Sequence, residues 1–163
     1  MILNSDQVRQ ILPHRDPFLF IDSVESVRIP GRTLGADEIL DIKEIQDAEV
    51  IAHYRTKKDH AIFAGHFPDY PILPGVVQVE MMAQATSFIV LLVKKNPSDV
   101  KMDVALLGIN EARFRRPVLP EMDLKLVTRT LKVRGPIITS ECKLYHNDQL
   151  MSEATVMASL KMQ

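Results

Sequence analysis

The chain has 163 residues, 46% of them apolar and 25% charged, with a net charge of −1. This length and apolar content predict one domain, residues 1–163, with a sizeable core. The balanced charge argues against a protein that binds nucleic acid or a membrane surface. The only cysteine, Cys142, excludes an internal disulfide; we expect it in the core of a cytoplasmic protein.

The first residues predict a short helix and then a rigid loop. Asn4–Asp6 offers helix caps, and a helix of about two turns should end before Pro13. Two charged residues interrupt this region, so no secretory signal sequence is expected. Pro13 and Pro17 bracket His14, which we interpret as a structural residue of the loop.

The segment before the centre of the chain predicts strands separated by turns. Pro30-Gly31 is a turn signal, and Lys57–Asp59 reads as a solvated turn. The strand-like runs are Phe18–Val27, Thr33–Asp41 and Ala48–Thr56.

The most apolar stretch of the chain, Gly75–Val93, predicts a buried helix. Pro74 suits the start of a helix, and the helix should stop near Asn96-Pro97. The uncharged part after Glu80, residues 81–93, is shorter than the ~20 residues needed to cross a bilayer. We therefore expect a core helix and no membrane insertion.

The last third of the chain predicts four strands. Arg134–Pro136 and His146–Asp148 are the turn signals between the later ones. The expected strands are Met102–Phe114, Leu124–Val133, Ile137–Tyr145 and a final strand with Ala154, Val156, Ala158 and Leu160 on one face. Strands that follow one another in sequence predict a meander. A helix of ~20 residues is about 30 Å long, and only a curled sheet covers it, so the fold class is α+β.

Two side chains around this helix suggest chemistry. His66 lies between Gly65 and a Phe-Pro corner, and histidine is the usual general base near neutral pH. Glu80 lies in the second turn of the apolar helix, where burial should raise its pKa, as a general acid requires. The free N–H groups of Gly75 and Val76 at the helix start are suited to stabilising a carbonyl oxygen as it becomes negative. This set predicts loss of a β-hydroxyl from a carbonyl compound after α-proton abstraction.

Simpler interpretations remain open on these residues alone. His66 fits equally a hydrogen-bonded loop residue, and Glu80 a salt-bridged interface residue. Gln84 lies one turn after Glu80 on the same face of the helix. It either forms a hydrogen bond with Glu80 or is a polar residue at an interface. No cluster has metal-ligand spacing, so neither a zinc site nor another cofactor site is expected. The remaining histidines receive no role: His53, His60 and His146.

Three motifs in the same order resemble one enzyme family. They are LPHRDPFLFID (residues 12–22), GHFPDYPILPGVVQVEMMAQ (65–84) and GINEARFRRPVLP (108–120). Together they resemble the (3R)-hydroxyacyl-acyl carrier protein dehydratases of bacterial fatty acid synthesis, the FabZ type. The resemblance spans nearly the whole chain and implies the hotdog fold, an antiparallel sheet wrapped around one long helix.

The resemblance also implies a site shared between two subunits. By position, His66 inherits the role of base, and Glu80 of the other subunit that of acid. Phe67, Gly75, Val76 and Gln84 would contact the substrate, a β-hydroxyacyl chain on the phosphopantetheine arm of acyl carrier protein. The expected assembly is a homodimer, with a hexamer as a trimer of dimers. The basic residues Arg113, Arg115 and Arg116 are candidates for docking the acidic carrier, or else ordinary solvated charges.

Two details separate this chain from relatives. Glu80 favours the dehydratase over the related dehydratase-isomerase, which has Asp at this position. The family has Gly-Asp where this chain has Glu121-Met122, and segment 31–59 is longer than usual. The alternatives are a hotdog thioesterase, in which water cleaves the thioester, and a non-catalytic acyl-thioester-binding subunit. No DNA-binding extension suggests a regulator.

Overall fold

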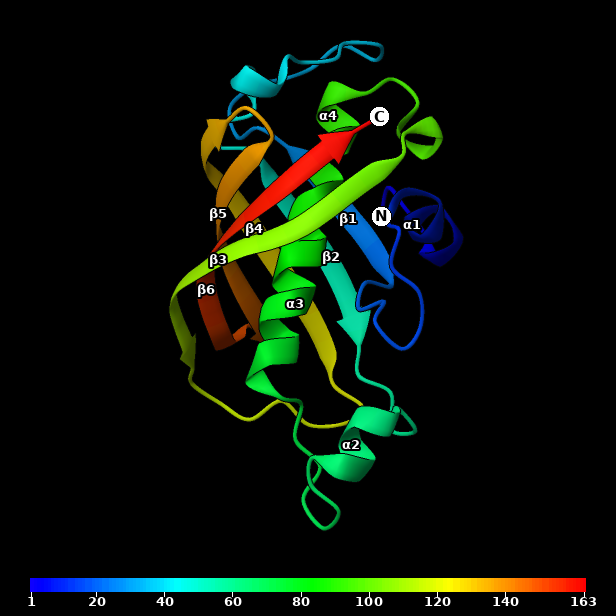
Figure 1. Ribbon diagram of the computed structural model, residues 1–163, viewed down its shortest axis with the longest axis vertical. Coiled ribbons are helices and arrows are strands. Elements are labelled where there is room, and N and C mark those ends of the chain that lie inside the picture. Colours follow the sequence, from blue (N-terminus) through cyan, green and yellow to red (C-terminus); the bar gives the residue numbers. More distant parts are fainter.

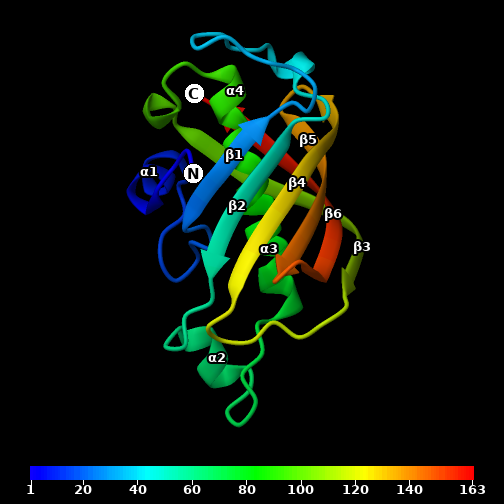
Figure 2. The same ribbon diagram turned by 180° about the vertical axis from the view of Figure 1, so that it is seen from behind.

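The computed structural model describes residues 1–163, which form one antiparallel sheet curled around a central helix (Figure 1). The six strands are ordered β1-β2-β4-β5-β6-β3. In Figure 1, β3 crosses in front of the helix α3 while β1, β2 and β4 lie behind it; Figure 2 shows the same sheet from the other side. The predicted α+β hotdog layout is confirmed.

The N-terminal helix is confirmed, but the strand after it is shorter than predicted. Helix α1 spans Ser5–Ile11 and begins with a capping box between Asn4 and Gln7. Strand β1 spans only Ser23–Arg28. The preceding residues, predicted as strand from Phe18, are instead bonded to a helix side chain, because Gln84 binds the Phe18 carbonyl and the Phe20 N–H.

The predicted strand at Thr33–Asp41 is wrong. This part of the β1–β2 connection is irregular, because local side chains satisfy its polar groups: Glu38 accepts from the Gly35 N–H and pairs with Arg32. Leu40 is buried and donates its N–H to the Leu92 carbonyl at the end of the central helix. The long connection therefore closes one end of the core. Strand β2 follows at Glu49–Arg55, inside the predicted run.

The central helix is continuous from Gly75 to Val93. It comprises α3 (Gly75–Thr86), a 3₁₀ turn at Ser87–Ile89 and α4 (Val90–Val93), and it ends before the predicted Asn96-Pro97. Its length and hydropathy would suit a membrane span, but 83% of the most apolar window is buried inside the protein. The helix is thus a core helix, covered by the sheet.

The last four strands occur close to their predicted positions. They are β3 (Met102–Phe114), β4 (Asp123–Arg134), β5 (Ile137–His146) and β6 (Gln149–Met162). Buried residues alternate along β4, β5 and β6, and Cys142 is in the core as expected. Only β4-β5-β6 form a meander. Strand β3 pairs with β6 instead of β4, because the helix needs cover on its other side.

The residue after β2, Thr56, is hydrogen-bonded to the tight turn that precedes β4. Thr56 is buried and donates its backbone N–H to the Met122 carbonyl. Its hydroxyl accepts the Met122 N–H and donates to the Leu119 carbonyl. Glu121 gives its N–H to the Thr56 carbonyl and has φ +61°. A left-handed backbone favours glycine, the residue that the family pattern has at this point.

We therefore predict that Glu121→Gly stabilises the protein by about 0.5–1 kcal/mol. Removing the left-handed penalty of about 1–2 kcal/mol outweighs the extra chain entropy of glycine, about 0.5–1 kcal/mol. Urea denaturation at fixed protein concentration measures the change. Glu121→Ala keeps the penalty and serves as the control. A glycine variant no more stable than the alanine variant would contradict the prediction.

Candidate active site

His66 lies where the short helix α2 (Ala61–Gly65) runs into the loop before α3. Its Nδ1 is 2.8 Å from the Ile72 carbonyl oxygen, and its ring stacks on Phe67 with centroids 4.1 Å apart. A carbonyl oxygen only accepts, so Nδ1 carries the hydrogen. In the neutral ring, Nε2 then has a free lone pair, which is the form a general base requires.

Glu80 lies in α3 between two polar side chains. Its Oε1 is 2.9 Å from Gln84 Nε2, which donates to it, and 3.4 Å from His14 Nε2. The Glu80 side chain is 26% exposed and that of His14 is 20% exposed. The contact with His14, followed by the hydrogen bond from Gln84, outweighs burial and lowers the pKa of Glu80 below its usual value. The expectation that the pKa of Glu80 is raised is therefore wrong.

Gln84 connects this carboxylate to the rest of the fold. It is buried, accepts the Phe20 N–H and donates to both the Phe18 carbonyl and Glu80. The sequence suggested the Glu80–Gln84 bond from their spacing. It assigned His14 only a structural role, because nothing local indicates that the loop returns to the second turn of a helix 66 residues later. The available signals were the pair of prolines around His14 and its place in the first motif, residues 12–22.

The start of α3 presents free backbone donors next to an exposed apolar side chain. The first helical bonds go from the Val77 and Gln78 N–H groups to the Pro74 carbonyl, and the N–H groups of Gly75 and Val76 have no acceptor in the chain. Val76 is 78% exposed. A Cβ on Gly75 would lie 2.8 Å from the Phe114 ring, so glycine lets β3 approach the helix start closely.

Within one chain, the predicted base and acid are held by different partners. His66 contacts Ile72 and Phe67, whereas Glu80 contacts His14 and Gln84; no hydrogen bond or ion pair joins His66 to Glu80. The two side chains therefore have separate contacts, one on the loop after α2 and one on the second turn of α3.

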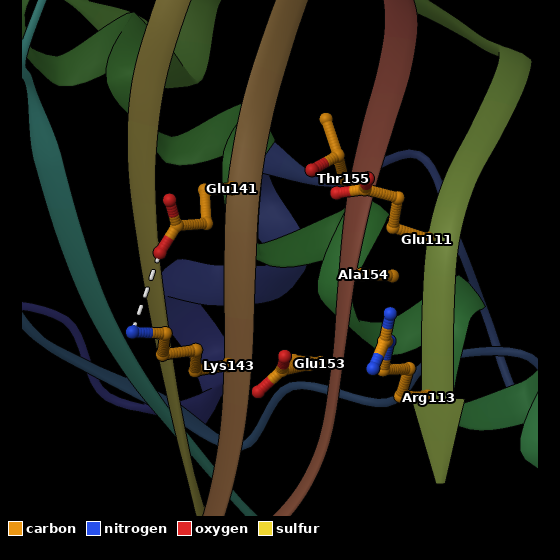
Figure 3. A pocket seen from close by; sticks show the side chains of 7 residues that line it. All are labelled: Glu111, Arg113, Glu141, Lys143, Glu153, Ala154 and Thr155. Carbon is orange, nitrogen blue, oxygen red and sulfur yellow. Dashed lines mark ion pairs between the residues drawn. The ribbon is translucent and has the colours of Figure 1, made fainter.

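The basic residues of the third motif lie in a mixed-charge region at the end of β3 and directly after it. Arg115 pairs with Glu153 at 3.2 Å, and this hydrogen bond, helped by the charges of Lys143 and Arg113, keeps the pKa of Glu153 below its usual value. Figure 3 shows the groove of about 310 Å³ on the outer face of β3, β5 and β6 that Arg113 shares with Glu111 and Glu153. Arg116 is exposed and has no ion pair. The three arginines are thus in different electrostatic settings.

Comparison with known proteins identifies the family. The model of the ApeI-like family, described as ApeI dehydratase, matches residues 42–153. The chain belongs to this dehydratase family. The dehydratase is also 33% identical, over 98% of both chains, to 3-hydroxyacyl-[acyl-carrier-protein] dehydratase FabZ of Desulforamulus reducens. It is 35% identical to the FabZ of Clostridium perfringens, over 83% of both chains.

Solved structures support the fold at low sequence identity. The ApeI:P dehydratase heterocomplex of Xenorhabdus doucetiae contains a chain that matches with a TM-score of 0.64, at 16% identity over 94% of this dehydratase and 90% of that chain. A thioesterase superfamily member from Thermus thermophilus matches with a TM-score of 0.57, at 17% identity over 74% and 86% of the two chains. Both similarities show the hotdog fold, which dehydratases share with thioesterases.

The lowered pKa of Glu80 predicts a pH-dependent contribution to stability. A carboxyl whose folded pKa is depressed stabilises the fold above its unfolded value, and this contribution is lost as the pH falls through the folded pKa. The difference in unfolding free energy between wild type and Glu80→Gln should therefore shrink below about pH 4.5, the ordinary value. Urea denaturation from pH 7 to pH 3 tests this. A difference that stays constant across this range would show that His14 and Gln84 do not stabilise the ionised form.

Proposed function

We propose that the dehydratase converts (3R)-hydroxyacyl-acyl carrier protein to the trans-2-enoyl thioester and water, in bacterial-type fatty acid biosynthesis in the cytoplasm. One observation carries the proposal: Nδ1 of His66 is fixed on the Ile72 carbonyl, which leaves Nε2 as a proton acceptor in the loop that leads into α3. The similarity to FabZ enzymes along the whole chain supports the substrate class.

In the proposed reaction, Nε2 of His66 removes the α proton of the thioester. The thioester carbonyl accepts from the free N–H groups of Gly75 and Val76, which stabilise the negative charge that develops on oxygen. The C–O bond to the β-hydroxyl then breaks as the C=C bond forms. Phe67, stacked on the imidazole, borders the acyl chain.

Glu80 supplies the proton that the departing hydroxyl takes up as water. The resting contacts favour the ionised carboxylate, so Glu80 must gain a proton before this step. Substrate binding promotes that change because it excludes water and disfavours a charged carboxylate. After release of the product, His66 loses the α proton to solvent and Glu80 remains ionised until the next substrate binds and it takes up one proton, so protons balance over the cycle.

Within one chain, His66 and Glu80 do not contact each other, which supports a site completed by a second copy. Strand β3 is at an edge of the sheet, paired only with β6. It carries four of the exposed large apolar side chains of the protein, Leu106, Leu107, Ile109 and Phe114. An unpaired apolar edge suits pairing with the same strand of another subunit. In the proposed homodimer, His66 of one subunit faces Glu80 of the other, and three dimers form the proposed hexamer.

His66→Ala should lower turnover by about 10²–10⁴-fold, as expected for loss of a positioned base. The assay incubates β-hydroxyacyl-carrier substrates of several lengths and detects water loss by mass and the enoyl product by absorbance. Free thiol is measured in parallel. Release of thiol by the wild type without enoyl product would replace the proposal with the thioesterase alternative, and near-normal turnover by a folded His66→Ala variant would refute the base assignment.

Mixed dimers test the shared site. His66→Ala and Glu80→Gln should each be nearly inactive, but a hybrid of the two contains one site with both wild-type residues. With random pairing about half of the dimers are hybrids, each with one intact site of two, so activity should return to roughly a quarter of wild type. Hybrids isolated with two different tags and no more active than the parents would exclude sharing.

Carrier docking predicts different effects for substrates with and without the carrier protein. Arg116→Glu should raise the KM for carrier-bound substrate and reduce its salt dependence, because an acidic partner loses an exposed cation. A short pantetheine analogue should be affected little. Arg115→Glu, which also loses the ion pair with Glu153, should raise the KM for carrier-bound substrate in the same way as Arg116→Glu. Arg134→Glu is the control, because Arg134 pairs with Ile137 at the start of β5, whereas Arg115 bonds to Met151 at the other end of the sheet, near the start of β6. An equal effect of this variant would reject a local docking site.

A further inference from the structure

His14 is close to the proposed acid although it belongs to a distant part of the chain. It lies in the loop between α1 and β1, and its Nε2 is 3.4 Å from Oε1 of Glu80 in α3. This is longer than a well-formed charge-assisted hydrogen bond, but both side chains are largely shielded from water. The mechanism above does not use His14, so the contact needs its own explanation.

The loop that carries His14 is fixed at both ends. Arg15 donates through its guanidinium to the carbonyls of Arg9, Leu12 and His14, which ties the loop to the end of α1. Gln84 holds the other side of the loop through Phe18 and Phe20. The position of the imidazole next to Glu80 is therefore set by backbone contacts from two elements.

The surroundings of the ring indicate which nitrogen carries the hydrogen. Nδ1 of His14 is buried and has no hydrogen-bond partner. A hydrogen on Nδ1 would be an unsatisfied buried donor, whereas a bare lone pair there costs less. The neutral ring with its hydrogen on Nε2 fits this environment, and that hydrogen faces the Glu80 carboxylate.

We propose that His14 is a positioning residue that, together with Gln84, orients the Glu80 carboxylate and holds it in the ionised form until substrate binds. Two donors on one carboxylate, one from the α1–β1 loop and one from α3, fix its rotation. Within the chain, His14 is the titratable side chain that contacts Glu80; in the proposed dimer, His66 of the second subunit also faces it. A role of His14 in catalysis rests on the proposed function, but its effect on the orientation and ionisation of Glu80 does not.

The direct test is a titration of the Glu80 carboxyl in the assembled protein. Protein with ¹³C-labelled glutamate carboxyls is titrated by NMR, and the Glu80 signal is assigned by its loss in Glu80→Gln. His14→Leu removes the donor and should raise the pKa of Glu80. His14→Gln places an amide N–H near the former Nε2 and should keep the titration close to wild type. His14→Phe, which fills the ring volume, replaces the leucine variant if that one does not fold.

Activity gives a second readout. In His14→Leu, loss of orientation should lower kcat on the order of 10- to 100-fold, with little change in KM. The limb of the pH–rate profile that reports Glu80 should shift in the same direction as the pKa of the Glu80 carboxyl. His14→Gln should recover most of kcat. Titration in the leucine or phenylalanine variant identical to wild type would overturn the proposal. If wild type proves not to be a dehydratase, the proposed function fails while the titration still decides whether His14 controls Glu80.

Discussion

The enclosure of one apolar helix by one curled sheet is the constraint on which the rest of the structure depends. The helix from Gly75 to Val93 is mostly buried, and the inward faces of the strands supply its cover. To cover both sides of the helix, β3 pairs with β6 and not with β4, the next strand in the chain. The long β1–β2 connection closes the end of the helix through Leu40. These departures from a simple meander follow from the need to keep apolar surface away from water.

The same burial explains why the polar groups of the helix are informative. A carboxylate and an amide on an apolar helix must be satisfied by partners, and in this protein the partners come from the α1–β1 loop. Gln84 bonds to Phe18 and Phe20, and His14 faces Glu80. The loop remains irregular because a side chain, and not a neighbouring strand, takes its backbone groups. The proposed acid and the path of the N-terminal segment thus depend on each other.

Much of the fold was predictable because its signals are local. The spacing of apolar residues located α1 and the last four strands, and the uninterrupted apolar run located the central helix. The errors occurred where distant contacts override local pattern. The pattern at Phe18–Asp22 predicts a strand, but Gln84 takes the backbone carbonyl of Phe18 and the N–H of Phe20. Thr33–Asp41 looked extended, but Arg32, Glu38 and the end of the central helix determine its path.

For the site, the sequence by itself indicated His66, Glu80, the helix start at Gly75 and the neighbour Gln84, because each lies in a short motif of characteristic composition. The spatial arrangement of these residues follows from the folded structure and not from their motifs. The folded structure brought His14 to Glu80, lowered a pKa that burial alone would raise, left Nε2 of His66 free and gave His66 and Glu80 different contacts within one chain. Protonation and proximity depend on groups far apart in sequence, and a linear pattern contains no information on which of them meet.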